Sequence, residues 1–482
     1  MFFSKKWLSV GAVVLLSACA AGPNYHTPDI TRSTADTLRA PQDFVRPHAG
    51  QSTELANWWR DFDDPLVARL IDATEQDNLS LAQAAARIKA ARAERGVALT
   101  AFLPGGGTQL AVTESRANGA SSKTTAAVLD ASWELDIFGG LRRGAEGANA
   151  RLASSVDSWH DLRVSLAAET ANVYVGLRAC EAQRDLLRSD VASREKSVKL
   201  TNLLVEEGFM APAEAALVEA GTASTRQQFV SAQVSCTSLG KSLSMLTGID
   251  EVNLTRELLD GQRKSLPAPR QFVVDSVPLV VVSQRPDVAA AERNLAAANA
   301  DIGVARANRL PRLSLSGNIS LGFLGVKLGD ANDSNTSSSF GPVLSLPILN
   351  AARLANLERA ARARYEESQA AYQQKVEQAV NEIEMALVNL DGANQRVKSA
   401  HTAADKFAYY FNASEVRYEV GTGSLLDLED ARRSQFMAKQ SLIDTERDRV
   451  LYWISLYKAA GGDWRERVIS NNQDAGKSHE LN

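Results

Sequence analysis

The placement of the prolines constrains the fold of this chain more than any other feature. Of its fourteen prolines, none lies between Pro104 and Pro212, none between Pro212 and Pro267, and none after Pro347. A proline inside a helix costs roughly 3 kcal/mol, because it lacks an N–H donor and clashes with the preceding turn. The proline-free intervals therefore permit helices far longer than those of ordinary globular domains.

Two of these intervals hold long segments rich in Ala, Leu, Glu, Gln, Arg and Val, at residues 141–207 and 350–420. At 1.5 Å rise per residue, each would form a helix roughly 100 Å long. A glycine-marked break follows each segment, GFMAP at 208–212 and GTG at 421–423, and a second helix of about forty residues is expected after each break. The pattern predicts two long αα-hairpins, which suit a structure that crosses a compartment.

The two hairpins belong to a tandem repeat. Gly208 lies 213 positions before Gly421, and the dipeptide Leu-Pro at 103–104 recurs 207 positions later. Such similar offsets indicate a duplication with small insertions. We expect repeat 1 to cover residues 58–265 and repeat 2 to cover residues 266–462.

Each repeat also contains a pair of short segments in which apolar and polar residues alternate, which is the period of a β-strand. The clearest alternation runs through Leu129, Ala131 and Trp133 in repeat 1 and through Leu313 and Leu315 in repeat 2. We expect one β-hairpin in each repeat. The predicted strands cover residues 108–116, 124–136, 312–324 and 338–348.

No apolar run of about 20 residues follows the N-terminal segment, so we expect no transmembrane helix in the mature chain and assign any membrane span to the strands. Strands of this length with one apolar face are typical of a barrel with a watery lumen. The alternation also fits a small soluble sheet with one wet face. Because lipid does not tolerate open sheet edges, four strands that span a membrane must share a barrel with other subunits.

The first residues are typical of a bacterial export signal, and LSAC at 16–19 matches the lipobox, whose cysteine is acylated and becomes the new N-terminus. We therefore expect a signal peptide at 1–18 and a lipidated linker at 19–57, anchored through Cys19. An ordinary signal peptide with a chance cysteine is the alternative. Residue 20 is Ala rather than Asp, which resembles the signal for transfer to the outer membrane.

The composition argues against several classes of function. Lysine and arginine number 53 against 57 acidic residues, and no basic block indicates a nucleic-acid partner. The five histidines lack metal-ligand spacing, and GGGT at 105–108 lacks the Lys-Ser/Thr of a phosphate-binding loop. We expect no metal, no cofactor and no enzymatic activity, so the energy for any transport would come from a partner.

Four strings are informative together: CAAGPNY at 19–25, WWRDFDDPL at 58–66, SWELDIFG at 132–139, and RPDV at 285–288 with the residues that follow it. They resemble the TolC-like outer-membrane efflux proteins, in the NodT-type lipoprotein branch of RND tripartite efflux systems. The resemblance extends from the lipobox to about residue 462. It departs from the family pattern at Leu349, where the family usually carries Phe.

The resemblance implies a mainly α-helical trimer with a β-barrel in the outer membrane and an α-barrel in the periplasm. Its function would be a passive exit duct for drugs, metals or other small toxic compounds. A periplasmic adaptor protein and an inner-membrane pump would be the partners. Segments such as 251–280 and the C-terminal part after residue 460 would form an equatorial belt, and residues 463–482 would form the C-terminal tail. An exit duct for type I protein secretion is the alternative within this class. A periplasmic adaptor would carry one long hairpin rather than two.

The resemblance also implies a gate. Residues 417–432 (RYEVGTGSLLDLEDAR) resemble the family's periplasmic tip, whose constriction uses a Leu and an Asp four residues apart, and these positions fall on Leu426 and Asp430. Four residues apart, they share one helix face, and three copies would form an apolar ring beside a cation-binding carboxylate ring. Alternatively, Asp430 only stabilises a helix N-terminus. The expected adaptor-contacting residues at the tips are Gly208, Phe209, Gly421, Thr422 and Gly423.

Two cysteines lie outside the lipobox, Cys180 and Cys236, and each is 28 positions from Gly208. In an antiparallel hairpin they fall at the same height, and export places them in an oxidising compartment. A disulfide further requires that both side chains point into the seam between the helices. We expect a bridge, and the alternative is two unpaired cysteines in an apolar seam.

Overall fold

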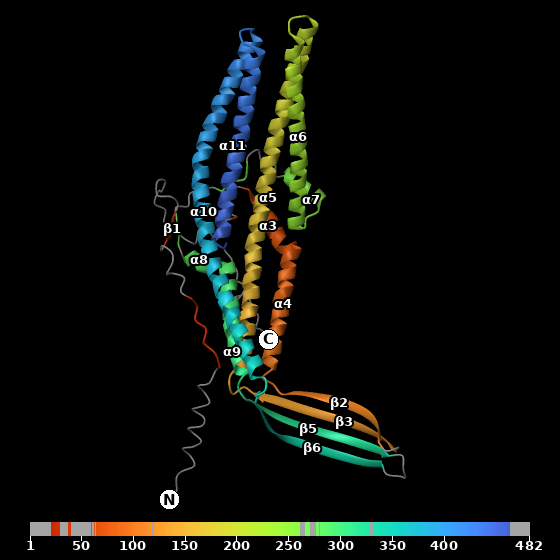
Figure 1. The fold of residues 1–482 in the computed structure, drawn as a ribbon. Coiled ribbons are helices and arrows are strands. Elements are labelled where there is room, and N and C mark those ends of the chain that lie inside the picture. Colours follow the sequence, from red (N-terminus) through yellow and green to blue (C-terminus); the bar gives the residue numbers. More distant parts are fainter. Residues whose placement is uncertain are drawn as a thin grey trace, which may run out of the picture. The chain divides into compact units, whose positions relative to one another are not determined.

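The computed structural model describes most of the chain (Figure 1). The expected signal peptide at 1–18, the lipobox Cys19 and the tail at 463–482 lie outside the described residues. The described residues are 21–28, 37–39, 59, 62, 64–117, 120–260, 266–269, 276–278, 280–326 and 332–462.

The chain forms two compact units. Unit 1 comprises residues 1–29, 84–158 and 289–375, and unit 2 comprises the rest. The two longest helices, α5 (Gly140–Glu206) and α10 (Ala351–Glu419), each run through both units. Each repeat therefore contributes to both units.

Unit 1 contains a four-stranded antiparallel sheet in the order β2-β3-β5-β6, as Figure 1 shows. The hairpin of repeat 1 is β2 with β3, the hairpin of repeat 2 is β5 with β6, and β3 pairs with β5 to join them. In the described residues β2 and β6 each have a single partner, so both are edge strands. The four strands cover Gly105–Ala117, Ala120–Leu135, Arg312–Val326 and Asn332–Ser345.

These bounds correct the predicted strand ends. The hairpins extend further toward their turns than predicted, because backbone groups continue the ladder through polar residues such as Ser121, which pairs with Arg116. The last strand ends at Ser345 instead of residue 348. Pro347 has no N–H for the ladder, and the N–H of Ile348 turns back to the Leu346 carbonyl at 3.0 Å.

Each hairpin of the sheet is preceded by a helix of 22 residues, α4 (Leu79–Thr100) in repeat 1 and α9 (Pro286–Ala307) in repeat 2. Within unit 1, the Ser154 hydroxyl of α5 donates to the carbonyl of Ala290 in α9 at 3.1 Å, which fixes α9 against the long helix. The alanines of α9 allow this close approach, and Ala300 is fully buried.

Unit 2 contains the paired parts of both helical hairpins. The first pairs α5, with 67 residues, with α6 (Pro212–Thr247), and the second pairs α10, with 69 residues, with α11 (Leu425–Ala459). Among the described residues, no helix is long and apolar enough to span a membrane. The remaining elements of unit 2 are α3 (Pro65–Asp77), α7 (Glu251–Asp260), α8 (Val280–Gln284), and a two-stranded sheet of β1 (Thr37–Arg39) and β4 (Ser276–Pro278).

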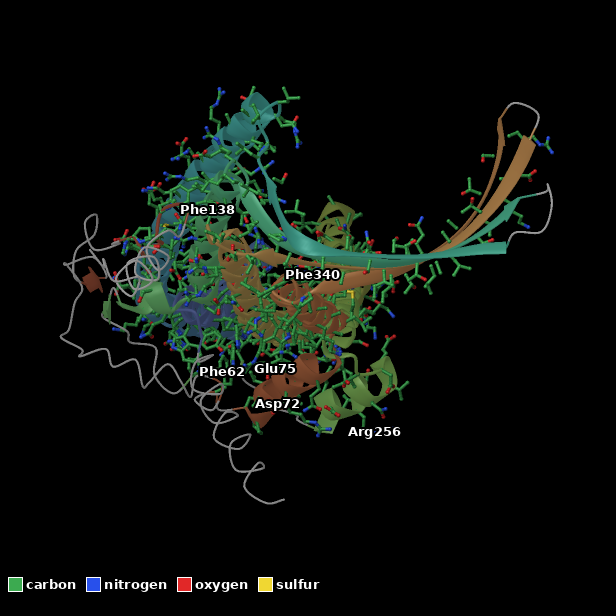
Figure 2. The ribbon with its side chains drawn as sticks, turned by 90° about the horizontal axis from the view of Figure 1, so that it is seen from below. Phe62, Asp72, Glu75, Phe138, Arg256 and Phe340 are labelled. Carbon is green, nitrogen blue, oxygen red and sulfur yellow. A yellow bond between two sulfur atoms is a disulfide. The ribbon has the colours of Figure 1, made fainter. Side chains whose placement is uncertain are left out.

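Buried aromatic residues form part of the core of unit 2. The Phe62 ring, labelled in Figure 2, meets Trp453 of α11 edge-on with ring centroids 5.2 Å apart. Beside it, the buried Tyr174 hydroxyl of α5 donates to Asp64 at 2.6 Å, and Asp64 also accepts from the Leu66 N–H and so caps α3. These contacts attach the segment before α3 to helices of both hairpins.

Candidate functional site

The tips of the two helical hairpins have the same backbone turn. Gly208 and Gly421 both have φ of +77°, a conformation that favours glycine. The next two N–H groups bond back to one carbonyl of the preceding helix, that of Leu204 in the first tip and that of Arg417 in the second, at 2.8 to 3.1 Å. The glycine-marked breaks of the sequence are therefore tight turns that end one helix and start the next.

The side chains at the two tips differ. In the first tip, Phe209 is 80% exposed, and Pro212 begins α6. In the second tip, Thr422 and Gly423 replace the bulky residues, and the Ser424 hydroxyl caps α11 by accepting from the Asp427 N–H at 3.1 Å. The structure thus places all five predicted tip residues at or beside a turn.

The predicted gate residues lie in the first two turns of α11. Leu426 is 65% exposed, and Asp430 follows one helical turn later on the same face. The carboxylate of Asp430 forms an exposed ion pair with Arg433. An exposed pair of this kind contributes little to stability and leaves the carboxylate accessible to water.

Behind this face, a buried network of ion pairs joins the two hairpins. Arg194 of α5 donates to Asp190 and to Glu429 of α11, both at 2.8 Å. Arg432 of α11 pairs with the same Glu429 and donates to Ser197 of α5 at 3.1 Å. Glu429 is therefore part of the contact between α5 and α11 and not simply a charge at a helix N-terminus.

The four-stranded sheet has one apolar and one polar face. Leu129 lies opposite Ile319, and Trp133 lies opposite Leu315, so their side chains gather on one face. The large apolar residues of this face are exposed in the single chain, Phe340 by 79%, and Figure 2 shows Phe340 on the sheet. Asp130 and Asn318 lie opposite each other on the other face. The predicted alternation is thus present in the sheet.

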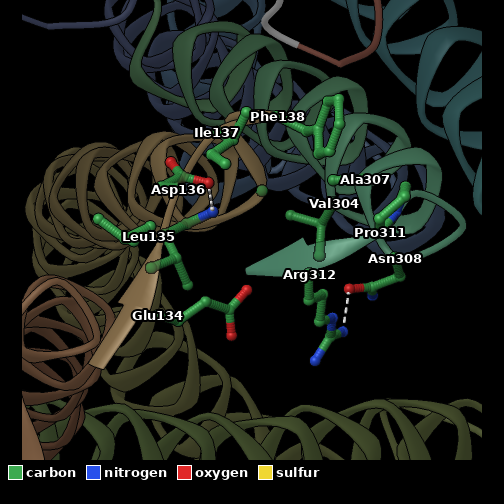
Figure 3. Close-up of a pocket in the computed structure, with 12 residues that line it drawn as sticks. Glu134, Leu135, Asp136, Ile137, Phe138, Val304, Ala307, Asn308, Pro311 and Arg312 are labelled. Carbon is green, nitrogen blue, oxygen red and sulfur yellow. Dashed lines mark hydrogen bonds between the residues drawn. The ribbon is translucent and has the colours of Figure 1, made fainter. Parts of the chain in front are cut away.

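Where β3 ends and α5 begins, residues of unit 1 line a small, half-open pocket of about 110 Å³ (Figure 3). Asp136 lies at its edge and accepts hydrogen bonds from the N–H groups of Leu141 and Arg142, at 3.0 and 2.9 Å, so that it caps α5. Glu134 and Arg312 reach into the pocket from the ends of two strands. At this junction Asp136 therefore satisfies two of the first N–H groups of α5, which have no partner within the helix.

No group of three His, Cys, Asp or Glu residues suited to a metal ion occurs in the part of the chain that the structure describes. A model of the family "Outer membrane efflux protein" matches residues 70–248 and 280–462, one match for each repeat. The chain belongs to this family of outer-membrane efflux proteins.

Individual efflux proteins of this kind resemble the chain over almost its whole length. The outer membrane protein OprJ of Pseudomonas aeruginosa is 29% identical and covers 94% of each chain. The probable efflux pump outer membrane protein TtgC of Pseudomonas putida is 27% identical over 98% of each chain. Among solved structures, the outer-membrane channel OprN is 28% identical with a TM-score of 0.78, over 92% of this chain and 100% of that one. The open-state MtrE channel of Neisseria gonorrhoeae is 25% identical with a TM-score of 0.75, over 92% of this chain and 98% of that one.

These similarities confirm the predicted resemblance, and with it the mainly helical, TolC-like fold with two tandem repeats. The chain is an outer-membrane efflux channel protein, and its location is the outer membrane.

In this efflux protein, Cys180 and Cys236 are bonded as a disulfide between α5 and α6, with Cα atoms 5.6 Å apart. Both residues are more than 90% buried. The sequence spacing to Gly208 was the signal that placed them at equal height. The network of Arg194, Glu429 and Arg432 had no such signal, because Arg194 and Glu429 are 235 positions apart and lie in different hairpins.

Proposed function

We propose that this efflux protein works as a trimer, in which three copies of the four-stranded sheet close one barrel in the outer membrane. The observation that carries the proposal is the sheet itself. It has an exposed apolar face and two edge strands, β2 and β6, each with a single partner in the described residues. Open edges cost several kcal/mol for each unpaired backbone group in lipid, and pairing between neighbouring copies removes that cost.

The exported compounds are proposed to be small toxic molecules, including antibiotics and organic solvents. Relatives include a toluene efflux pump, an antibiotic efflux pump and a solvent efflux pump outer membrane protein. The similarity to each of these three extends over at least 95% of this chain. The chain itself would act as a passive exit duct for these compounds. The polar face of the sheet, with Asp130 and Asn318, would line a wet path without binding any one compound tightly.

A periplasmic adaptor and an inner-membrane pump are the proposed partners, and the hairpin tips are their proposed contact. Phe209 supports this assignment, because an apolar ring that is 80% exposed at a turn is suited to burial by a partner. We expect Phe209→Ala to lower recovery of the adaptor in a pull-down from intact cells. Met245→Ala, at a similarly exposed position (77%) near the other end of α6, is the matched control. Equal recovery with both variants would remove the tip from the contact.

An acyl anchor on Cys19 is the proposed membrane attachment of the N-terminus, supported by the lipobox at 16–19. Labelling with radioactive palmitate tests it directly. Label that persists in Cys19→Ser would show that Cys19 is not the acceptor.

The trimer is tested by native mass spectrometry of the full chain in detergent. We expect a mass three times that of the acylated subunit, without a stable monomer. A stable monomer as the main species would contradict the shared barrel, since the edges of β2 and β6 would then need no partner.

A further inference from the structure

The apolar face of the four-stranded sheet carries a groove of about 490 Å³. The floor of the groove is formed by two small residues that lie opposite each other, Ala131 of β3 and Gly317 of β5. Both are on the same face as Leu129 and Ile319, because the side chains of a strand alternate between its two faces. The volume falls in the range of small-molecule sites, roughly 300 to 1,000 Å³.

Larger apolar side chains lie at both ends of this floor. Leu129 and Ile319 are paired at one end, and Trp133 and Leu315 are paired at the other. All four lie two positions along their strands from Ala131 or Gly317, so they point to the same face. The depth of the groove therefore depends on the small floor residues, and a larger side chain at Ala131 would fill it.

Phe340 of β6 forms the side wall of the groove. It is the register partner of Gly317, and a Cβ added to Gly317 would lie 3.0 Å from Cδ2 of the Phe340 ring. The ring therefore lies against the glycine. Phe340 is 79% exposed in the single chain, and Figure 2 shows it on the sheet.

Trp133 forms the end of the groove that is nearest the helices. Its indole N–H donates to the carbonyl of Phe102, between α4 and β2, at 2.8 Å. The polar atom of the indole is thereby satisfied, and the ring can offer its apolar surface to the groove. Tryptophan is enriched where a membrane meets water, so this end corresponds to the polar boundary. From Trp133 to Leu129 the groove extends over about 13 Å, at about 3.3 Å per residue.

The position of the groove in the sheet indicates what can occupy it. The floor lies on β3 and β5, the two central strands. Copies that pair through the edge strands β2 and β6 extend the sheet sideways and leave the faces of the central strands uncovered. Asp130 and Asn318 also border the groove, but their side chains belong to the opposite face, which suits water.

We propose that the groove binds one acyl chain of a phospholipid from the inner leaflet of the outer membrane, with the headgroup at the Trp133 end. An acyl chain is narrow and apolar and needs no hydrogen-bond partner, which matches this lining. The proposal rests on the proposed barrel, with the helices on the periplasmic side. Because its chain lies in a groove between side chains, this lipid exchanges more slowly than its neighbours and fixes the depth of the sheet in the membrane.

The test counts the phospholipids that stay bound to the full-length protein in native mass spectrometry. The protein is released from detergent micelles that contain palmitoyl-oleoyl phosphatidylethanolamine. Ala131→Leu fills the floor of the groove. Ala127→Leu is the matched control, because Ala127 lies on the same face of β3, opposite Leu321, and does not line the groove.

We expect the wild-type protein to retain one phospholipid per subunit, Ala131→Leu to lower this number several-fold, and Ala127→Leu to leave it unchanged. Phe340→Ala, which removes the side wall at an exposed position, should also lower the number. In proteoliposomes, a phospholipid brominated in its acyl chain should quench the tryptophan emission of the wild type and of Ala127→Leu more than that of Ala131→Leu, because Trp133 lines the groove.

Equal retention in the wild type and Ala131→Leu would overturn the proposal, and so would equal losses in Ala131→Leu and Ala127→Leu. If Ala131→Leu loses the trimer rather than the lipid, a neighbouring copy covers the groove, which also overturns the proposal. A wild-type trimer without retained lipid would overturn the groove proposal alone. A stable wild-type monomer would contradict the barrel, and the groove proposal would then hold only if the lipid retained by that monomer still depended on Ala131.

Discussion

The two helical hairpins began as copies of one another, and they have kept the backbone and changed the side chains. Both tips use a glycine at φ +77° with the same pattern of hydrogen bonds. At matched positions after these glycines, hairpin 1 carries Ala213 and Leu217 where hairpin 2 carries Leu426 and Asp430. A turn is retained because only a few residue types allow its geometry, whereas exposed positions on the helix are free to acquire new roles.

The hairpins also differ in how their helices are held together. In hairpin 1, a disulfide joins Cys180 and Cys236. At the same distance from the turn, hairpin 2 carries Ala393 and Arg449, which form no covalent bond. Ion pairs such as Arg194 with Glu429 join the two hairpins to each other. This difference makes hairpin 1 the covalently braced half and hairpin 2 the half that carries the proposed gate.

Removing the brace should have the largest effect on stability. The bond closes a loop of 56 positions, so Cys180→Ser with Cys236→Ser should destabilise hairpin 1 by about 4 kcal/mol in the chain-entropy model. Hydrogen exchange measured by mass spectrometry should show faster exchange in α5 and α6, with α10 and α11 as the internal reference. Equal acceleration in both hairpins would mean that the bond does not brace hairpin 1 in particular.

A smaller expected difference between the hairpins is the loss of stability at low pH. His160 of α5 is buried, and burial, with a contribution from the charge of Arg163, lowers its pKa to about 4. The unfolded chain binds this proton near pH 6.5, so stability falls as the pH drops from 6.5 to 4, by up to about 3 kcal/mol. The residue at the same distance from the start of α10 is Ala371, which does not titrate.

We therefore expect His160→Phe to reduce the loss of thermal stability between pH 6.5 and 4. Thermal unfolding of both proteins across this range measures the difference. Identical pH profiles for wild type and variant would contradict the assignment of this acid sensitivity to His160.

The smallest expected effect tests whether the turns at the two tips are equivalent. A Cβ on Gly208 or Gly421 would meet no atom within 4 Å, so Gly208→Ala and Gly421→Ala should each cost about 1–2 kcal/mol through backbone conformation alone. Gly392→Ala, inside α10 and equally open, should stabilise by about 1 kcal/mol because alanine favours the helix. Denaturation of the three variants measures this, and a cost at one tip only would show that the turns are not equivalent.

The long helices could be predicted to within one residue at each end, because glycine and proline mark their limits locally. The strand ends were less predictable, since polar residues such as Ser121 continue a ladder that depends on the partner strand. The contact of Arg194 with Glu429 could not be predicted, because the spacing of residues along a helix does not reveal which other helix it faces. The close approach of Gly22 to Gly303, where a Cβ on Gly22 would lie 2.6 Å from the Cα of Gly303, could not be predicted for the same reason.

The gate assignment adds a functional difference to the structural one. If hairpin 2 alone constricts the path, Asp430→Ala should raise the conductance of the channel. Leu217→Ala, at the matched position in hairpin 1, should leave the conductance unchanged. The effect should grow when the apolar side chain of Leu426 is also shortened, because both residues lie on one face of α11.

Single-channel conductance in planar lipid bilayers tests the central claim most directly. We expect the wild-type protein to form a pore of low conductance, Leu426→Ala and Asp430→Ala each to raise the conductance, the double variant to raise it further, and Leu217→Ala to leave it unchanged. Absence of any pore, or a conductance that is the same in wild type, both single variants and the double variant, would contradict the account of a channel that hairpin 2 closes.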